Sequence, residues 1–250
     1  MRAYVEAGIA AGLSEVGFSV HMPVPIPIAE KINLDEGEFR MYIEKARRLR
    51  QEYNDRIGVL IGGEFDYIPD QLPQIERLAN AFDFDFRVGS VHFIDDWNFD
   101  NPGYLDRWET ADVEAAYRRY YHLMAEMAET SLFDIVGHFD LVKKFGHRPD
   151  RDVSDAIAEV ARAVADAGMT VEINTAGWSK PVGEQYPSEE ILRLLYDLGV
   201  PICLGSDAHA PGQVGRDFDR AISLARRVGW SAVNRFSQRR TFAEPLPAAG

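Results

Sequence analysis

Short apolar runs alternate with longer amphipathic segments along the whole chain. The apolar runs predict strands at 15–20, 57–61, 86–91, 134–136, 170–173 and 201–204. The amphipathic segments predict helices near 2–12, 36–54, 70–81, 111–130, 152–167, 187–198 and 216–228. Regular alternation of strand and helix is typical of repeated βα units around a parallel sheet. We therefore expect an α/β fold, with one domain over residues 1–250.

The chain opens on a predicted helix, although each later helix follows a strand. Adding a strand upstream would give seven βα units, so we expect this chain to lack an initial strand. Gly12, Gly168 and Gly199 each end a helical pattern, where a left-handed cap is expected. Residues 237–250 are polar and then rich in proline and alanine, which predicts a peripheral covering segment or a frayed end.

The amino-acid composition argues against nucleic-acid and membrane partners. A formal charge of −13, with no cluster of lysine or arginine, argues against nucleic acid as a partner. Cys203 is the only cysteine, so no internal disulfide can form and a cytoplasmic location is expected. No run approaches the roughly 18 apolar residues of a membrane span, which predicts a soluble protein without a membrane partner. No feature of the sequence predicts an oligomeric state.

Ionisable residues recur where the predicted strands end. They are His21, Glu64, His92, His138, Asp207 and His209, contributed by five strands. In a βα barrel the active site is built at the C-terminal ends of the strands. Imidazole and carboxylate ligands suit Zn, Fe and Mn, and the absence of thiolates excludes a closed Cys₄ zinc site. The pattern therefore predicts a catalytic divalent-metal site with open positions.

A single histidine at a strand end more often caps or hydrogen-bonds than binds a metal. Here four of the six histidines occupy successive strand ends, accompanied by a glutamate and an Asp-x-His pair, which favours a common site. The other two, His122 and His147, fall in a predicted helix and a predicted turn, so we assign them surface or packing roles.

Six segments together carry a family resemblance. They are GFSVHMP at 17–23, GEFDY at 63–67, GSVHFID at 89–95, GHFDLVKKF at 137–145, EINT at 172–175 and GSDAH at 205–209. In this order, with YPS at 186–188 before a helix, the chain resembles the histidinol-phosphatase branch of the polymerase and histidinol phosphatase (PHP) family. The resemblance implies a distorted (β/α)7 TIM-like barrel.

The resemblance also implies the chemistry. Glu64 would bridge two metals in a centre of up to three divalent ions, His92 and His138 would complete one site, and Asp207, His209 and His21 would serve the others. Glu64, His92, Asp207 and His209 would be the catalytic residues. The reaction would be hydrolysis of a phosphate monoester, histidinol phosphate, in histidine biosynthesis. Closely spaced cations suit this slow reaction because they activate water and clamp phosphoryl oxygens.

Cationic and aromatic residues on loops after the strands are candidates for substrate binding. Lys143, Lys144 and Lys180 could neutralise the phosphate. The loop 95–97 (Asp-Asp-Trp) and Trp178 could wall an imidazole.

The chain departs from the family pattern in two ways. Members carry an earlier strand ending in His-x-His, followed by an Asp, and these ligands would precede Met1. They also usually carry Asp directly before the histidine at position 21, where this chain has Val20. Losing a carboxylate that orients a metal-bound imidazole typically costs 10–100-fold in affinity or activity. Taken alone, residues 1–250 should bind metals incompletely.

Two explanations stay open: a start codon assigned too late, or a truncated gene whose product binds metal or phosphate without hydrolysis. Rival activities are another metal-dependent hydrolase, such as an amidohydrolase, or a PHP phosphoesterase acting on nucleotides. A glutamate at the bridging position argues against the amidohydrolase, and the net charge argues against a nuclease.

Overall fold

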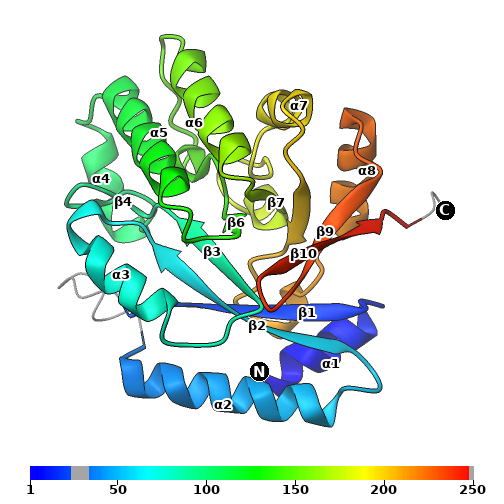
Figure 1. The fold of residues 1–250 in the computed structure, drawn as a ribbon. Helices are drawn as coiled ribbons and strands as arrows, with labels where there is room; N and C mark the ends of the chain where they lie inside the picture. The colour runs from blue at the N-terminus through cyan, green and yellow to red at the C-terminus, as the bar shows by residue number, and fades with distance from the viewer. Residues whose placement is uncertain (24–33, 248–250) are drawn as a thin grey trace.

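The computed structural model describes residues 1–23 and 34–247. Six parallel strands form one curled sheet in the order β1-β2-β3-β6-β7-β8, which makes a half-barrel (Figure 1). Their bounds are β1 Glu15–His21, β2 Gly58–Asp66, β3 Phe86–Ser90, β6 Ile135–Val136, β7 Thr170–Asn174 and β8 Ile202–Gly205. All six strands predicted from the sequence are present. The sheet is open between β1 and β8, which are not paired with each other in the described residues.

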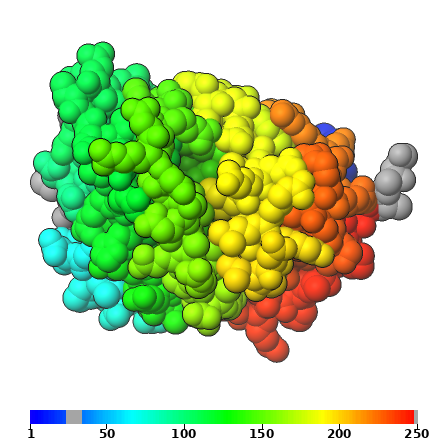
Figure 2. Space-filling model, turned by 90° about the horizontal axis from the view of Figure 1, so that it is seen from above, coloured from blue at the N-terminus to red at the C-terminus, as the bar shows by residue number. Residues whose placement is uncertain are grey.

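The predicted helices are also confirmed, with ends shifted by a few residues. They are α1 Arg2–Ala10, α2 Glu36–Glu52, α3 Leu72–Ala79, α5 Val113–Glu129, α6 Ser154–Asp166, α7 Glu189–Asp197 and α8 Phe218–Val228. Figure 2 shows one outer face on which α5 and α6 (green), α7 (yellow) and α8 (orange) follow one another in chain order. None of the helices in the described ranges is both long and apolar enough to cross a bilayer.

Helix α2 holds the first two strands in place. It begins at a capping box, in which Glu38 N donates to Asp35 Oδ1 at 2.7 Å and Asp35 N donates to Glu38 Oε2 at 2.9 Å. The buried Tyr42 hydroxyl lies 2.9 Å from the carbonyl of Phe18 in β1 and 3.1 Å from that of Gly62 in β2. These contacts fix β1 and β2, the strands that carry His21 and Glu64, at one edge of the sheet.

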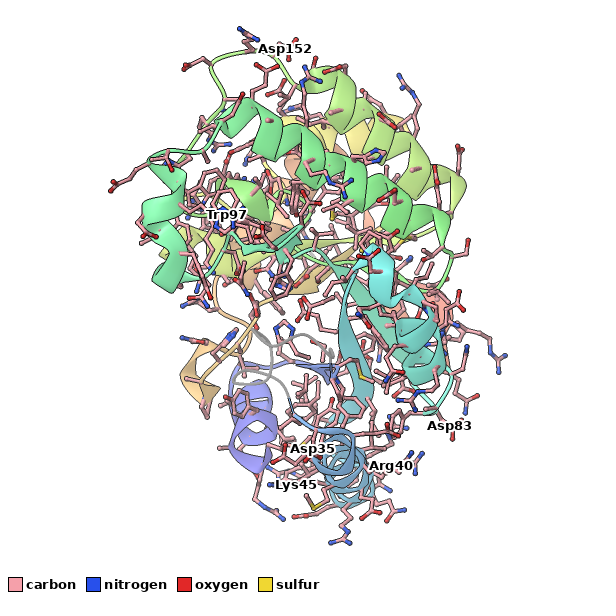
Figure 3. The ribbon with its side chains drawn as sticks, turned by 90° about the vertical axis from the view of Figure 1, so that its left-hand side faces the viewer. Asp35, Arg40, Lys45, Asp83, Trp97 and Asp152 are labelled. Carbon is pink, nitrogen blue, oxygen red and sulfur yellow. The ribbon has the colours of Figure 1, made fainter. Side chains whose placement is uncertain are left out.

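An insertion after β3 was not predicted. It contains the hairpin β4 Phe93–Ile94 and β5 Trp97–Asn98, the short helix α4 Leu105–Trp108 and the 3-10 turn η3 Pro102–Tyr104. Trp97 is buried and packs against Trp108 with ring centroids 4.5 Å apart. In Figure 3 Trp97 lies among packed side chains, whereas Asp35, Arg40 and Lys45 lie at the end of the molecule occupied by α2. Single-turn elements such as these give no periodicity that a sequence can reveal.

The C-terminal segment is more ordered than the frayed end that the sequence allowed. Residues Ala232–Ser237 and Arg240–Pro245 form strands β9 and β10, an antiparallel hairpin outside the main sheet. Gln238 and Arg239 have φ values of 50° and 61°, the left-handed conformation of a two-residue hairpin turn. Phe236, the residue before the predicted tail, is buried against Phe86 with ring centroids 5.9 Å apart, whereas β10 is exposed.

Ion pairs fasten this hairpin to residues at the starts of the strands. Arg235 contacts Glu15 Oε2 at 2.5 Å, and Arg239 donates to Asp134 Oδ1 at 3.0 Å. The Arg239 amide donates to the carbonyl of Asp85 at 2.8 Å. Glu15 opens β1, while Asp85 and Asp134 directly precede β3 and β6. The hairpin therefore closes the N-terminal end of the half-barrel and leaves the C-terminal ends of the strands open.

Phe86 fills the interior above the hairpin because its neighbours lack side chains. A Cβ atom built on Gly62 would lie 2.4 Å from Phe86 Cε2, and one on Gly17 would lie 2.8 Å from the same ring. These contacts are closer than van der Waals packing permits, so a methyl group at either position must displace the ring.

We expect Gly62→Ala to lower the free energy of unfolding by about 1–3 kcal/mol, because it overpacks the ring of Phe86. Gly212→Ala is the matched control, since no heavy atom lies within 4 Å of a Cβ atom built there. Urea unfolding followed by circular dichroism measures both. Equal stability of the two variants would contradict the packing described here.

Candidate metal centre

A cavity of about 310 Å³ opens at the C-terminal ends of the strands. Its lining includes all six predicted metal ligands together with Asp66: His21, Glu64, Asp66, His92, His138, Asp207 and His209. These residues come from β1, β2 and the turns that follow β3, β6 and β8. The structure therefore brings the predicted ligands to one cavity, although they differ in how deeply they lie.

Strand β2 supplies two carboxylates to the cavity. It runs five residues further than the predicted 57–61, so Glu64 and Asp66 lie within the strand, two residues apart and on the same face. The side chains of Glu64 and Asp66 are 12% and 4% exposed. Glu64 Oε1 accepts a hydrogen bond from Ser90 Oγ at 2.8 Å. Both carboxylates are thus removed from bulk water and need positive partners.

Three imidazoles surround Glu64. Its Oε1 lies 3.1 Å from His138 Nε2 and 3.7 Å from His92 Nε2, and its Oε2 lies 3.8 Å from His21 Nε2. The rings of His92 and His138 are 4.8 Å apart, and those of His21 and His92 are 5.0 Å apart. Four of the predicted ligands therefore form one compact cluster.

The electrostatics of the cluster favour added positive charge. Burial disfavours the imidazolium of His21, but the negative charges of Glu64 and Asp66 outweigh it and raise the pKa of His21 to about 10. Burial likewise opposes ionisation of His138, but the hydrogen bond and charge of Glu64 raise its pKa to about 9. Burial would raise the pKa of Glu64, yet the adjacent histidines hold it well below its usual range. The cluster would hold protons at neutral pH if no other cation were present.

The donors fit a divalent cation. Two groups of three residues have ligand atoms within 4.8 Å of one another: His21, Asp66 and His92, and Glu64, His92 and His138. Imidazole nitrogen and carboxylate oxygen are the donors that Zn²⁺, Fe and Mn²⁺ accept. The fit is supported further by His138 Nδ1 and His21 Nδ1, which are buried without a hydrogen-bond partner among the described residues.

Asp207 and His209 lie at the rim of the cavity, outside these two groups. Their side chains are 32% and 74% exposed, and His209 Nδ1 lies 2.9 Å from the Asp207 carbonyl. Asp207 has a φ of 44°, a left-handed conformation that aspartate, asparagine and histidine adopt more often than other residues with a side chain.

The three predicted substrate lysines occupy different environments. Lys144 and Lys180 line the cavity, and Lys144 Nζ contacts Asp100 Oδ2 at 2.8 Å. Lys143 is fully buried away from it, with Nζ 2.8 Å from Asp140 Oδ2, 2.7 Å from Glu184 Oε2 and 2.7 Å from the carbonyl of Gln185. All three ammonium hydrogens therefore have acceptors inside the protein, and the structure does not bring Lys143 to the cavity.

The predicted wall for an imidazole lies elsewhere. Asp95 and Asp96 are exposed and pair with Arg119 and Arg107, and Trp97 is buried in the insertion. Trp178 packs under the guanidinium of Arg220 at 4.0 Å. None of these four lines the cavity in the described residues; its outer wall is formed by Phe93, Asn98, Asp100, Asn101, Pro102, Leu141 and Tyr186.

Two acidic residues near the centre were not predicted. Asp66 contacts both His21 and His92, with His92 Nδ1 2.5 Å from its Oδ1. Glu172 in β7 is packed so closely against Gly205 that a Cβ atom there would lie 1.6 Å from its Oε1. Burial, followed by the charges of Asp207 and Glu64, raises the pKa of Glu172 to about 7. The available signal was the two-residue spacing of Glu64 and Asp66, which places both on one face if the strand continues.

His122 and His147 are outside the site, as predicted. His122 Nε2 lies on the exposed face of α5, 3.5 Å from Glu126 Oε1. The ring of His147 stacks on Trp108 at 4.8 Å with an interplanar angle of 7°.

The known proteins that this chain resembles include histidinol-phosphatases. A probable histidinol-phosphatase of Deinococcus radiodurans is 39% identical over 232 residues, which cover 93% of this chain and 88% of the relative. A histidinol phosphate phosphatase of Lactococcus lactis, solved with Zn, L-histidinol and phosphate, has 25% sequence identity and a TM-score of 0.82. That alignment covers 96% of this chain and 92% of the Lactococcus chain.

A solved structure from Listeria monocytogenes shares the fold, with 21% identity and a TM-score of 0.68 over 87% of this chain and 92% of its own. The family model described as PHP domain matches residues 1–176, which contain β1 to β7 and the Glu64 cluster. With this match and a 39% identical relative over most of its length, the chain belongs to the PHP domain family.

Proposed function

We propose that this protein is a metal-dependent histidinol-phosphatase, which hydrolyses L-histidinol phosphate to L-histidinol and phosphate. The observation that carries the proposal is the cluster at the cavity, where Glu64 lies within 3.8 Å of three imidazoles. Histidinol-phosphatase relatives with the same fold support the choice of substrate, since the Lactococcus lactis protein binds L-histidinol and phosphate.

The residues that would hold divalent ions are His21, Glu64, His92 and His138, with Asp207 and His209 completing the set from the rim. The Zn of the Lactococcus lactis structure favours Zn, and Fe or Mn suit the same donors, in a centre of up to three ions. Bound divalent ions lower the pKa of coordinated water and stabilise charge on the phosphoryl oxygens. We propose Glu64, His92, Asp207 and His209 as the catalytic residues.

The protein's own residues would bind and orient the substrate. Lys144 and Lys180 would attract the phosphate from the wall of the cavity, and Lys144 is held for this by Asp100. The apolar and amide side chains of the insertion, Phe93 and Asn98, would exclude water from one side of the leaving group.

Glu64→Gln tests the proposal most directly. Removing the charge at the centre of the cluster should lower phosphate release from histidinol phosphate by about 1,000-fold, because several kcal/mol of metal-dependent stabilisation depend on it. His122→Gln is the control, since this exposed histidine lies outside the cavity. Phosphate release is measured with added Zn²⁺ or Mn²⁺. Wild-type protein that binds metal but releases no phosphate would instead favour a binding barrel.

Metal binding at pH 8 should release more protons from this cluster than it would from imidazoles with ordinary pKa values. With pKa values of about 10 for His21 and about 9 for His138, both rings are mainly imidazolium cations at pH 8 in the absence of metal. One proton from each should be displaced, giving about two per chain, whereas an imidazole with the usual pKa of about 6.5 would release almost none at pH 8.

Calorimetric titration with Zn²⁺ in buffers of different ionisation enthalpy measures this number. The part of the release that is lost in His21→Gln and His138→Gln should stay nearly constant from pH 6.5 to 8 and decline only as the pH approaches the raised pKa values. His21→Gln and His138→Gln should each remove about one proton from the total. A share from these two histidines that falls steeply between pH 6 and 8 would contradict the electrostatics described for the cluster.

The lysines allow a contrast between binding and stability. Lys180→Met and Lys144→Met should raise KM about 10-fold through a lost charge-assisted contact, with a smaller effect on kcat. Lys143→Met should instead lower the free energy of unfolding by about 3–5 kcal/mol, because it leaves the buried Asp140 without its partner. Steady-state kinetics and urea unfolding separate the two effects. An unchanged KM in both cavity variants would remove these lysines from the substrate site.

A further inference from the structure

We propose that Asp66 is a positioning residue that holds His92 by its Nδ1 atom, so that His92 Nε2 faces Glu64. The inference rests on the proposed metal site but concerns a residue that the site does not itself require as a ligand. Asp66 is buried, and each of its carboxylate oxygens lies beside a different imidazole.

The two nitrogens of each imidazole ring face different carboxylates. Asp66 Oδ1 lies 2.5 Å from His92 Nδ1, and Asp66 Oδ2 lies 3.4 Å from His21 Nδ1. On the opposite side, the Nε2 atoms of His92 and His21 lie 3.7 and 3.8 Å from Glu64. One carboxylate of β2 therefore contacts the Nδ1 atoms, and the other faces the Nε2 atoms.

The 2.5 Å separation argues against Asp66 and His92 Nδ1 binding the same ion. Two donors bound to one tetrahedral Zn²⁺ at about 2.0–2.1 Å lie about 3.3 Å apart. A spacing of 2.5 Å is shorter than this, and shorter than the roughly 2.7–2.9 Å of a charge-assisted N–H···O hydrogen bond, so the two atoms are in direct contact with no ion between them. The distances of 3.1 and 3.7 Å from Glu64 to His138 and His92 are compatible with shared ions.

The arrangement also explains how the chain tolerates Val20. Adjacent residues of a strand point to opposite faces, so the side chain of Val20 lies on the other side of β1 from His21 and packs against the hydrophobic core. The carboxylate that lies beside the imidazole of His21, that of Asp66, therefore comes from the neighbouring strand. Glu64 pairs with His21 in the parallel register, which places Asp66 just beyond the end of β1.

The first experiment uses the wild-type protein loaded with Zn²⁺. Long-range ¹H–¹⁵N correlation spectra of the histidine rings report which nitrogen carries the proton. We expect protonated Nδ1 and unprotonated Nε2 for His92. The opposite tautomer at His92 would overturn the proposal without the need for any variant.

The second experiment compares Asp66→Asn with the wild type by competition for Zn²⁺ with a chelating dye. Loss of an orienting carboxylate should weaken Zn²⁺ binding 10–100-fold while the number of ions bound per chain stays the same. Asp85→Asn is the matched control: Asp85 is a buried aspartate at the other end of the sheet that accepts from Ile61 N at 2.8 Å. This control should reduce thermal stability and leave Zn²⁺ affinity unchanged.

The outcomes are distinct. Unchanged Zn²⁺ affinity in Asp66→Asn would overturn the positioning role, and a loss of one bound ion would make Asp66 a ligand and overturn it too. Weakened affinity in Asp66→Asn, in a protein that releases no phosphate from histidinol phosphate, would uphold the inference while rejecting the proposed function. Hydrolysis of histidinol phosphate by the wild type, with unchanged Zn²⁺ affinity in Asp66→Asn, would uphold the proposed function and reject the positioning role of Asp66.

Discussion

The burial of two negative charges on one strand is the constraint on which the site depends. Glu64 and Asp66 lie on the same face of β2, and the charged partners that contact them in the described structure are imidazoles rather than lysine or arginine. Buried carboxylates without a cation are costly, so this face must acquire protons or metal ions. The raised pKa values of His21 and His138 have the same cause, because the nearby carboxylates stabilise the protonated rings. The positions of the histidines at the strand ends place positive charge beside these carboxylates.

The sequence predicted the repetitive part of the fold and the composition of the site. Each long strand and helix carries its own periodic pattern, and His21, His92 and His138 follow strands whose ends could be recognised. The parallel sheet then brings these ends together without further information, because its carboxyl ends share one edge. The family assignment rests on the same segments and is confirmed by the comparisons.

Features that depend on tertiary contacts were beyond the sequence. Lys143 and Lys144 are neighbours in the chain, yet one is enclosed by acceptors and the other reaches the cavity, because a one-residue step in the turn η4 Leu141–Lys143 points them in different directions. The role of Asp66 depended on where β2 ends. Trp97 was expected to line a substrate site because it falls in a loop after a strand. The sequence could not show that Trp108 packs against Trp97 in the folded protein.

Because the hairpin of β9 and β10 closes the half-barrel, the two ends of the sheet are completed at different times while the protein is being translated. Phe236 and Arg239, which cover Phe86 and contact the residues before β3 and β6, are translated after every strand of the sheet and after His209. The metal-binding rim can therefore leave the ribosome before the opposite end of the sheet is covered. The apolar residues at that end, Phe86 and Ile135 among them, therefore gain their cover later than the residues beneath α5 and α6.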